Sequence, residues 1–260
     1  KDALGEKSVA VNFAYHYKKI TLGATCFSLK YDYPLKSSSS RAFEGSSSTI
    51  ISVYSLYSAP NISLGGEYSL YSEEFPAVKL YSLFKLNNVD FAVHYRNYHS
   101  NYRSFWGYNF GESSIPANEE GLYTAFYAKI SKNLRTEGYL DLYRTHCRTY
   151  SVEKPIKGFD YSIKHLYDNE LLGSFFLLIR AEAKTDGFKP KGAQNQVIYT
   201  LRRNQVRFEF ERRIIKNLTF KTRFDATDID FEHKKPNENG YASYLQINYD
   251  VLKNLSITGR

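Results

Sequence analysis

The chain has 260 residues, a formal net charge of +8 and 17% aromatic residues, among them 24 Tyr and 18 Phe. It contains no apolar run of about 18 residues, so its composition excludes a membrane-spanning helix. Two cysteines, Cys26 and Cys147, are too few for a disulfide framework and leave one disulfide or two free thiols open.

Apolar and polar residues alternate with a period of two along most of the chain, which predicts β-hairpins and no helix. About fourteen strands are expected. They cover residues 9–17, 20–33, 49–57, 62–70, 77–85, 89–98, 120–130, 134–149, 159–167, 172–184, 205–214, 218–227, 241–251 and 255–260.

The connections between these strands fall into two kinds. Short turns close the hairpins, and a Lys-Asn pair recurs in three of them, at 132–133, 216–217 and 253–254. Longer polar connections join one hairpin to the next, above all the Ser-rich residues 35–48 and residues 99–119. Short turns at one end and long loops at the other are typical of outer-membrane barrels.

The hairpin at residues 205–227 predicts its own register. With Ile215-Lys216-Asn217 as a three-residue loop and Asn217 left-handed, Ile214 faces Leu218, and Phe208 faces Phe224. Three charge pairs then line the opposite face as a lumen charge ladder: Glu211 with Lys221, Glu209 with Arg223, and Arg207 with Asp225. The same rule at residues 252–254 places Val251 opposite Leu255 and Tyr249 opposite Ile257.

Periodicity alone does not say which face of the strands meets water. A soluble barrel places its apolar face inside, whereas a membrane barrel turns it toward lipid and keeps a polar lumen. Mixed charges and amides recur strand after strand and favour a wet lumen: Asp90, His94, Arg96, Arg207, Glu209, Glu211, Lys221, Arg223, Asp225, Gln246, Asn248 and Asp250. The sequence therefore predicts an all-β, antiparallel up-and-down transmembrane β-barrel, with residues 1–260 as a single domain. A soluble β protein is the alternative.

The last predicted strand, residues 255–260, is shorter than the roughly nine to eleven residues of a transmembrane strand. An open barrel edge in lipid leaves backbone groups unpaired, which is costly. We therefore expect the barrel to be incomplete here, with closing strands beyond Arg260.

Two segments resemble the barrel region of Bacteroidota outer-membrane proteins of the helix-hairpin-helix (competence-type) family. They are VDFAVHYRNYHSNYRSFWGYNFGESSIPANEEGLYTAFYAKISKNL at 89–134 and RNQVRFEFERRIIKNLTFKTRF at 203–224. The connection at 102–120 is the distinctive part. The resemblance implies a barrel in the bacterial outer membrane. The helix-hairpin-helix part is absent from this sequence, so no DNA-binding role follows.

Residues that carry chemistry are few. The six histidines show neither HExxH nor Cys/His spacing, and no GxSxG occurs, so no metal site, cofactor or catalytic residue is expected. His16 and His94 are expected on the polar face. The adjacent carboxylates Glu119 and Glu120 should point to opposite faces as a solvated pair at a loop end.

Two aromatic or apolar groups leave alternatives open. In the apolar run 175–179, Phe176 and Leu178 are expected to face inward, where they either pack locally or meet a plug or docked partner. The long connection contains five aromatic residues that form either an exposed loop binding patch or a cap folded back on the barrel: Tyr102, Phe105, Trp106, Tyr108 and Phe110.

The functional expectation is an integral outer-membrane barrel that is no enzyme and serves as a structural or interaction subunit of an outer-membrane assembly. The alternatives are a diffusion pore or uptake channel, since about 14 strands leave room for water, and an outer-membrane hydrolase. The expected partners are outer-membrane lipid, lipopolysaccharide and other outer-membrane proteins. The positive charge fits a phosphate-rich partner or simply a solvated basic surface, and no nucleic acid is expected.

Overall fold

The computed structural model describes residues 5–36, 43–104, 110–112, 115–149, 151–192, 194–232, 238–252 and 255–259. In these residues the regular secondary structure consists of β-strands alone. The first seven strands are β1 (Glu6–Tyr17), β2 (Ile20–Leu35), β3 (Gly45–Ala59), β4 (Ile62–Tyr71), β5 (Phe75–Leu86), β6 (Val89–Tyr98) and β7 (Glu119–Lys129). The other seven are β8 (Leu134–Arg144), β9 (Lys157–Asn169), β10 (Gly173–Phe188), β11 (Val197–Ile215), β12 (Leu218–Phe231), β13 (Glu238–Leu252) and β14 (Leu255–Gly259). No helix in this part of the chain is long and apolar enough to cross a bilayer.

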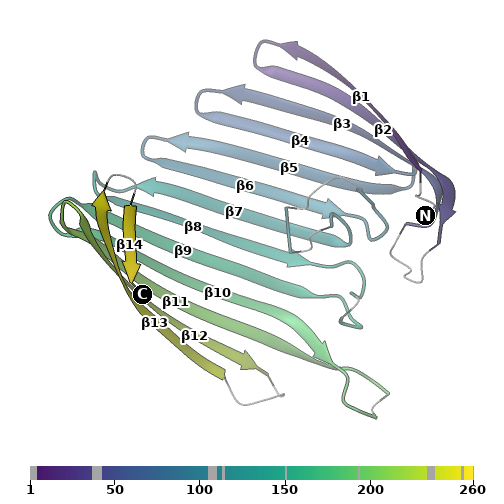
Figure 1. The fold of residues 1–260 in the computed structure, drawn as a ribbon. Helices are drawn as coiled ribbons and strands as arrows, with labels where there is room; N and C mark the ends of the chain where they lie inside the picture. Colours follow the sequence, from purple (N-terminus) through teal and green to yellow (C-terminus); the bar gives the residue numbers. More distant parts are fainter. Residues whose placement is uncertain are drawn as a thin grey trace. The chain divides into compact units, whose positions relative to one another are not determined.

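All fourteen strands belong to one antiparallel sheet and follow one another in chain order, with β1 and β14 at its two edges (Figure 1). The prediction of an all-β, up-and-down fold with about fourteen strands is confirmed. Several bounds differ: β8 ends at Arg144 and not at Thr149, and β11 begins at Val197, ahead of the predicted Gln205.

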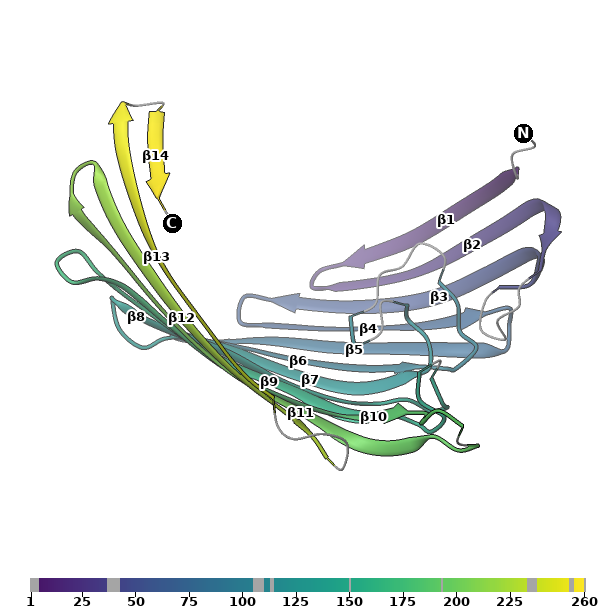
Figure 2. The ribbon, with the colours of Figure 1, turned by 60° about the horizontal axis from the view of Figure 1, so that its bottom comes forward.

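The chain divides into two compact units. Unit 1 contains Lys1–Lys85, Ala92–Tyr123 and Tyr143–Thr149, and unit 2 contains Leu86–Phe91, Thr124–Leu142 and Tyr150–Arg260. In unit 1, β1 to β5 run side by side, as do β9 to β13 in unit 2 (Figure 2). Because both units belong to one sheet, the division does not decide the prediction of a single domain.

Strand alternation gives each unit two faces, an apolar face that carries mostly apolar side chains and a polar face that carries the charged and polar ones. In unit 2 the apolar face contains a row of direct cross-strand partners from β9 to β13: Ile163, Ile179, Val206, Ala226 and Tyr241. In unit 1 the matching row from β1 to β5 is Phe13, Ala24, Val53, Tyr68 and Val78. Alternation therefore carries the apolar pattern of single strands across the sheet.

The β11–β12 hairpin confirms the predicted charge register and corrects its turn. Arg207 faces Asp225, Glu209 faces Arg223, Glu211 faces Lys221 and Phe208 faces Phe224. However, Ile215 and not Ile214 pairs with Leu218, because the register shifts between Arg213 and Ile215. The turn is thus a two-residue Lys216-Asn217 turn preceded by a bulge at Ile214, and Asn217 is not left-handed. The bulge absorbs one residue, so the pairs farther from the turn match the prediction.

The last hairpin has the same irregularity. Tyr249 faces Ile257 as predicted, but Leu252 and not Val251 pairs with Leu255, with a register shift between Asp250 and Leu252. A register shift beside the turn therefore recurs in both hairpins, although Lys253 and Asn254 themselves lie outside the described residues.

Small residues on the polar face of unit 1 leave room for large neighbours that lie across the sheet. A Cβ at Gly23 would collide with the ring of Tyr54, and one at Gly121 would collide with the guanidinium of Arg96. Glycine at these places lets a long side chain from the next strand lie flat on the backbone. The Tyr54 hydroxyl then reaches Asn12 Oδ1 at 3.3 Å.

Candidate functional site

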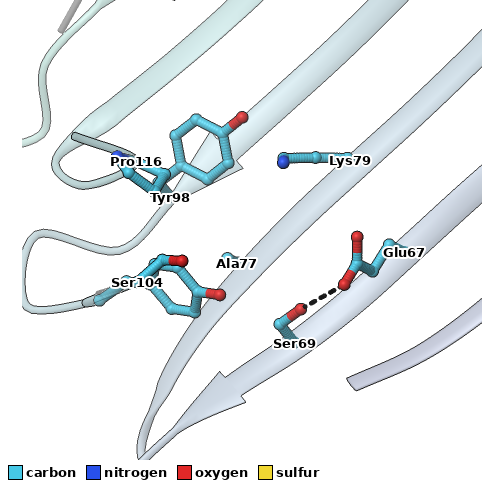
Figure 3. A pocket seen from close by; sticks show the side chains of 8 residues that line it. Glu67, Ser69, Ala77, Lys79, Tyr98, Ser104 and Pro116 are labelled. Carbon is cyan, nitrogen blue, oxygen red and sulfur yellow. Dashed lines mark hydrogen bonds between the residues drawn. The ribbon is translucent and has the colours of Figure 1, made fainter. Parts of the chain in front are cut away.

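A pocket of about 220 Å³ opens on the polar face of unit 1, between β4, β5, β6 and the connection that follows β6 (Figure 3). Its lining residues are Glu67, Ser69, Ala77, Lys79, Tyr98, Tyr102, Ser104 and Pro116. The β4–β5 register places Glu67 directly opposite Lys79 and Ser69 opposite Ala77. Strand alternation therefore delivers the strand side chains of the pocket to one face.

Glu67 and Lys79 are opposite in charge and directly opposite in register, yet they form no ion pair. The Lys79 Nζ lies 5.8 Å from the centre of the Tyr98 ring, and Figure 3 shows its side chain extending toward Tyr98. The Glu67 carboxylate instead accepts a hydrogen bond of 3.1 Å from the Ser69 hydroxyl. Within the described ranges, Lys79 forms no salt bridge with any carboxylate. The pocket therefore presents one charge of each sign.

Two tyrosines form the most buried part of the pocket. Tyr98 is 0% exposed, and its hydroxyl has no hydrogen-bond partner in the part of the chain that the structure describes. Tyr102 is 7% exposed and packs edge-on against Tyr71, with ring centres 6.4 Å apart. Burial raises the pKa of Tyr102, although a hydrogen bond with Ser69 acts in the other direction. A buried hydroxyl without a partner is costly, so Tyr98 is an unusual lining residue for its environment.

A buried ion pair lies on the same two strands that flank the long connection. Arg96 Nε donates to Glu119 Oε1 at 2.5 Å, and the two side chains are 0% and 2% exposed. The Glu112 backbone N–H also donates to this carboxylate, at 3.3 Å. Glu120 points to the other face, where it accepts hydrogen bonds from Tyr95 and Arg144. The predicted opposite orientation of Glu119 and Glu120 is thus right, whereas a solvated Glu119 is wrong, because Arg96 and the connection cover it.

The predicted charge ladder of unit 2 is a closed network. Asp225 accepts from Arg207 Nε at 2.7 Å and from Arg223 Nε at 2.5 Å. The Lys221 ammonium lies 3.3 Å from Glu209 and 3.6 Å from Glu211. These charges therefore neutralise one another within the sheet.

The inward apolar residues of β10 lie beside this network. Phe176 has Leu166 and Glu209 as its cross-strand partners, and Leu178 has Lys164 and Arg207. Both therefore lie on the polar face, as predicted, while the direction of that face toward a barrel interior stays a prediction. A second pocket, of about 210 Å³, lies here and is lined by Leu166, Ser174, Phe176, Glu209, Glu211 and Lys221. A docked plug or partner at this place stays a prediction.

Of the predicted exposed aromatic patch, the structure describes Tyr102 and Phe110, and Phe110 is 46% exposed. Tyr102 is buried, which contradicts its place in such a patch. Phe110 packs edge-on against His94 and Tyr123, with ring centres 4.7 and 4.8 Å apart. Both residues thus fold back onto the polar face, as the cap alternative predicts. Phe105, Trp106 and Tyr108 lie outside the described residues.

No metal centre emerges in the described part of the chain, where no three His, Cys, Asp or Glu side chains come together. Cys26 and Cys147 are both free and exposed. His16, His146 and His165 hydrogen-bond to Thr21, Asn97 and Thr136.

Sequence reasoning missed the pocket of unit 1. The pairing of its two charged residues could have been predicted, because a short turn after Tyr71 pairs Tyr71 with Phe75 and, counting outward, Glu67 with Lys79. The partnerless hydroxyl of Tyr98 has no sequence signal, because it depends on how the connection after β6 packs. Compared with protein-family models, with curated proteins and with solved structures, the chain matches none of them.

Proposed function

We propose that this protein is an integral β-barrel-type protein of the bacterial outer membrane that acts as a structural or interaction subunit of an outer-membrane assembly. The observation that carries the proposal is the apolar face of each unit. Many large apolar side chains on it are exposed, for example Val53 at 53% and Leu80 at 50% in unit 1, and Phe224 at 46% in unit 2. Soluble proteins rarely expose contiguous apolar surfaces of this extent, whereas lipid-facing strands require them.

The polar face supports a structural role over an open channel. The charges of unit 2 are paired with one another, and the connection after β6 rests on the polar face of unit 1 through Phe110 and Glu112. The resemblance of residues 89–134 and 203–224 to Bacteroidota outer-membrane barrels agrees with this location. Lipid and lipopolysaccharide are then the partners of the apolar face, and other outer-membrane proteins are the partners of the assembly.

A matched pair of arginine substitutions tests which solvent the apolar face meets. Val206→Arg places a charge on the apolar face, whereas Thr227→Arg, one position from the cross-strand partner of Val206, places it on the polar face beside Asp225. In lipid we expect Val206→Arg to destabilise the folded state by about 2–4 kcal/mol and Thr227→Arg much less. In water, arginine at the exposed Val206 would change stability by only about 0.5 kcal/mol.

The measurement is chemical unfolding in lipid vesicles together with cell fractionation. The wild-type chain should remain with outer membranes after carbonate extraction and show a heat-modifiable gel shift. Recovery as a soluble monomer without detergent, or equal stability of the two variants, would contradict the proposal. Steady ion conductance in planar bilayers would assign the pore alternative in place of the structural role.

A further inference from the structure

The pocket of unit 1 combines three features that the proposed function does not use. It contains a cation and a carboxylate that do not pair with each other, and a fully buried hydroxyl without a partner. All three features lie on the polar face of unit 1, so ligand binding there does not depend on whether the apolar face meets lipid or water.

We propose that this pocket binds a small zwitterion, a molecule with one carboxylate and one ammonium group, such as an α-amino acid. The Lys79 ammonium has three donors and lies over the ring of Tyr98. Tyr98 lines the same pocket, and its buried hydroxyl is one more donor for a ligand once a small shift of the ring uncovers it. A carboxylate is the group that accepts from both at once, and its bond to Lys79 is charge-assisted.

The opposite side of the pocket selects the second charge. The Glu67 carboxylate accepts a bond from Ser69 through Oε1, and its remaining lone pairs can accept from an ammonium group. Inorganic anions would meet repulsion from Glu67, and neutral sugars would leave both protein charges without an ionic partner. The zwitterion is the ligand class that satisfies Lys79, Tyr98 and Glu67 together.

The volume limits the size of the ligand. A cavity of about 150 Å³ accommodates benzene, so the volume of about 220 Å³ accommodates a molecule of amino-acid size and not an extended peptide. Ala77 and Pro116 provide the apolar part of the lining, which fits the carbon atoms between and beside the two charged groups.

The test is calorimetric titration of the purified full chain in detergent with five probes. They are L-glutamine, N-acetyl-L-glutamine, which lacks the ammonium group, L-glutamine α-amide, which lacks the carboxylate, inorganic phosphate and glucose. We expect L-glutamine to bind and each modified glutamine to bind at least about tenfold more weakly. No binding of L-glutamine, or equal binding of phosphate or glucose, would overturn the proposal.

Variants locate the binding. Lys79→Met and Glu67→Gln should each weaken L-glutamine binding by about tenfold or more, and Tyr98→Phe by several-fold. Lys85→Met is the matched control, because Lys85 lies on the same strand, is exposed and does not line the pocket. Glu67→Gln and Tyr98→Phe change almost no volume, so they report on binding even if Lys79→Met fails to fold. Undiminished binding in both would contradict the assignment.

Discussion

Each unit has a pocket on its polar face, and the two pockets have similar volumes. They differ in whether their charged lining residues form ion pairs with one another. In unit 2 the pocket of about 210 Å³ is lined by Glu209, Glu211 and Lys221, which form ion pairs of 3.3 and 3.6 Å. In unit 1 the pocket of about 220 Å³ is lined by Glu67 and Lys79, which are direct cross-strand partners but stay apart. Register decides which side chains face each other, but not whether they touch.

The neighbours of each charge explain the difference. In unit 2 the charges of the ladder have opposite charges close by, so Arg223 lies within reach of both Asp225 on its own strand and Glu209 across from it. In unit 1 the neighbours offer other contacts: Lys79 finds the ring of Tyr98, and Glu67 finds the hydroxyl of Ser69. Closed ladders therefore stabilise the sheet, whereas separated charges leave capacity for a ligand.

The largest expected effect comes from a closed and buried charge pair of unit 1, Arg96 with Glu119. Arg96→Met leaves Glu119 without its cation at 2% exposure, so we expect the free energy of unfolding to fall by about 3–5 kcal/mol. The double variant Arg96→Met/Glu119→Gln should recover most of this loss, because no buried charge remains. Chemical unfolding in detergent measures both.

The matched control for this prediction is an exposed pair in unit 2. Lys164 and Glu137 form a salt bridge of 2.8 Å, but their side chains are 42% and 50% exposed. Lys164→Met should therefore cost only about 0–1 kcal/mol. Equal losses for Arg96→Met and Lys164→Met would show that burial of the Arg96–Glu119 pair has no consequence for stability.

Much of the fold could be predicted from the sequence, because a period of two is a local signal. Alternation around residues 205–227 was sufficient to predict three charge pairs that the structure forms. The turn itself could not be predicted in the same way. The extra residue at Ile214 is accommodated as a bulge, and whether a short turn closes with or without a bulge depends on the twist of the two strands.

The candidate site was much less predictable. From the sequence, the Glu119 side chain is predicted to be solvated, because no local pattern indicates that Arg96 and the backbone N–H of Glu112 bind it. Tyr98 reads as one of many strand tyrosines. Its burial results from packing with Tyr71, Ala77 and Tyr102, the last of which belongs to a connection without a period. Side-chain burial by long connections is a tertiary effect that alternation does not contain.

Two buried tyrosines, one in each unit, give the next largest contrast. The Tyr199 hydroxyl of unit 2 donates to Asp186 Oδ2 at 2.8 Å, whereas the Tyr98 hydroxyl of unit 1 has no partner in the described residues. Tyr199→Phe removes a hydrogen bond to a charged group, so we expect it to destabilise the protein by about 1.5–3 kcal/mol. Tyr98→Phe removes a buried donor that is not bonded and should leave stability unchanged or raise it by about 1 kcal/mol.

Chemical unfolding of the two Tyr→Phe variants under identical conditions, without added ligand, decides this contrast. The two rings are 0% and 5% exposed, so differences in burial do not account for the expected result. A loss for Tyr98→Phe as large as that for Tyr199→Phe would mean that the Tyr98 hydroxyl already has a bonding partner, and the pocket would then lose one of its donors.

The smallest expected effect is the coupling free energy between one pair of opposite charges in each unit, which double-mutant cycles measure directly. One cycle combines Arg207→Met with Asp225→Asn in unit 2, and the other combines Lys79→Met with Glu67→Gln in unit 1. Both pairs are direct cross-strand partners of opposite charge.

Arg207 and Asp225 are in contact at 2.7 Å, so we expect their coupling free energy to be about 0.5–1 kcal/mol. The value stays modest because Arg223 remains as a second partner of Asp225. Lys79 and Glu67 are not in contact, so their coupling should be close to zero without ligand. It should become measurable when L-glutamine is present, because a bound zwitterion connects the two charges. Equal coupling in the two cycles without ligand would mean that Glu67 and Lys79 interact as closely as the ladder residues, and the contrast between the two pockets would then be lost.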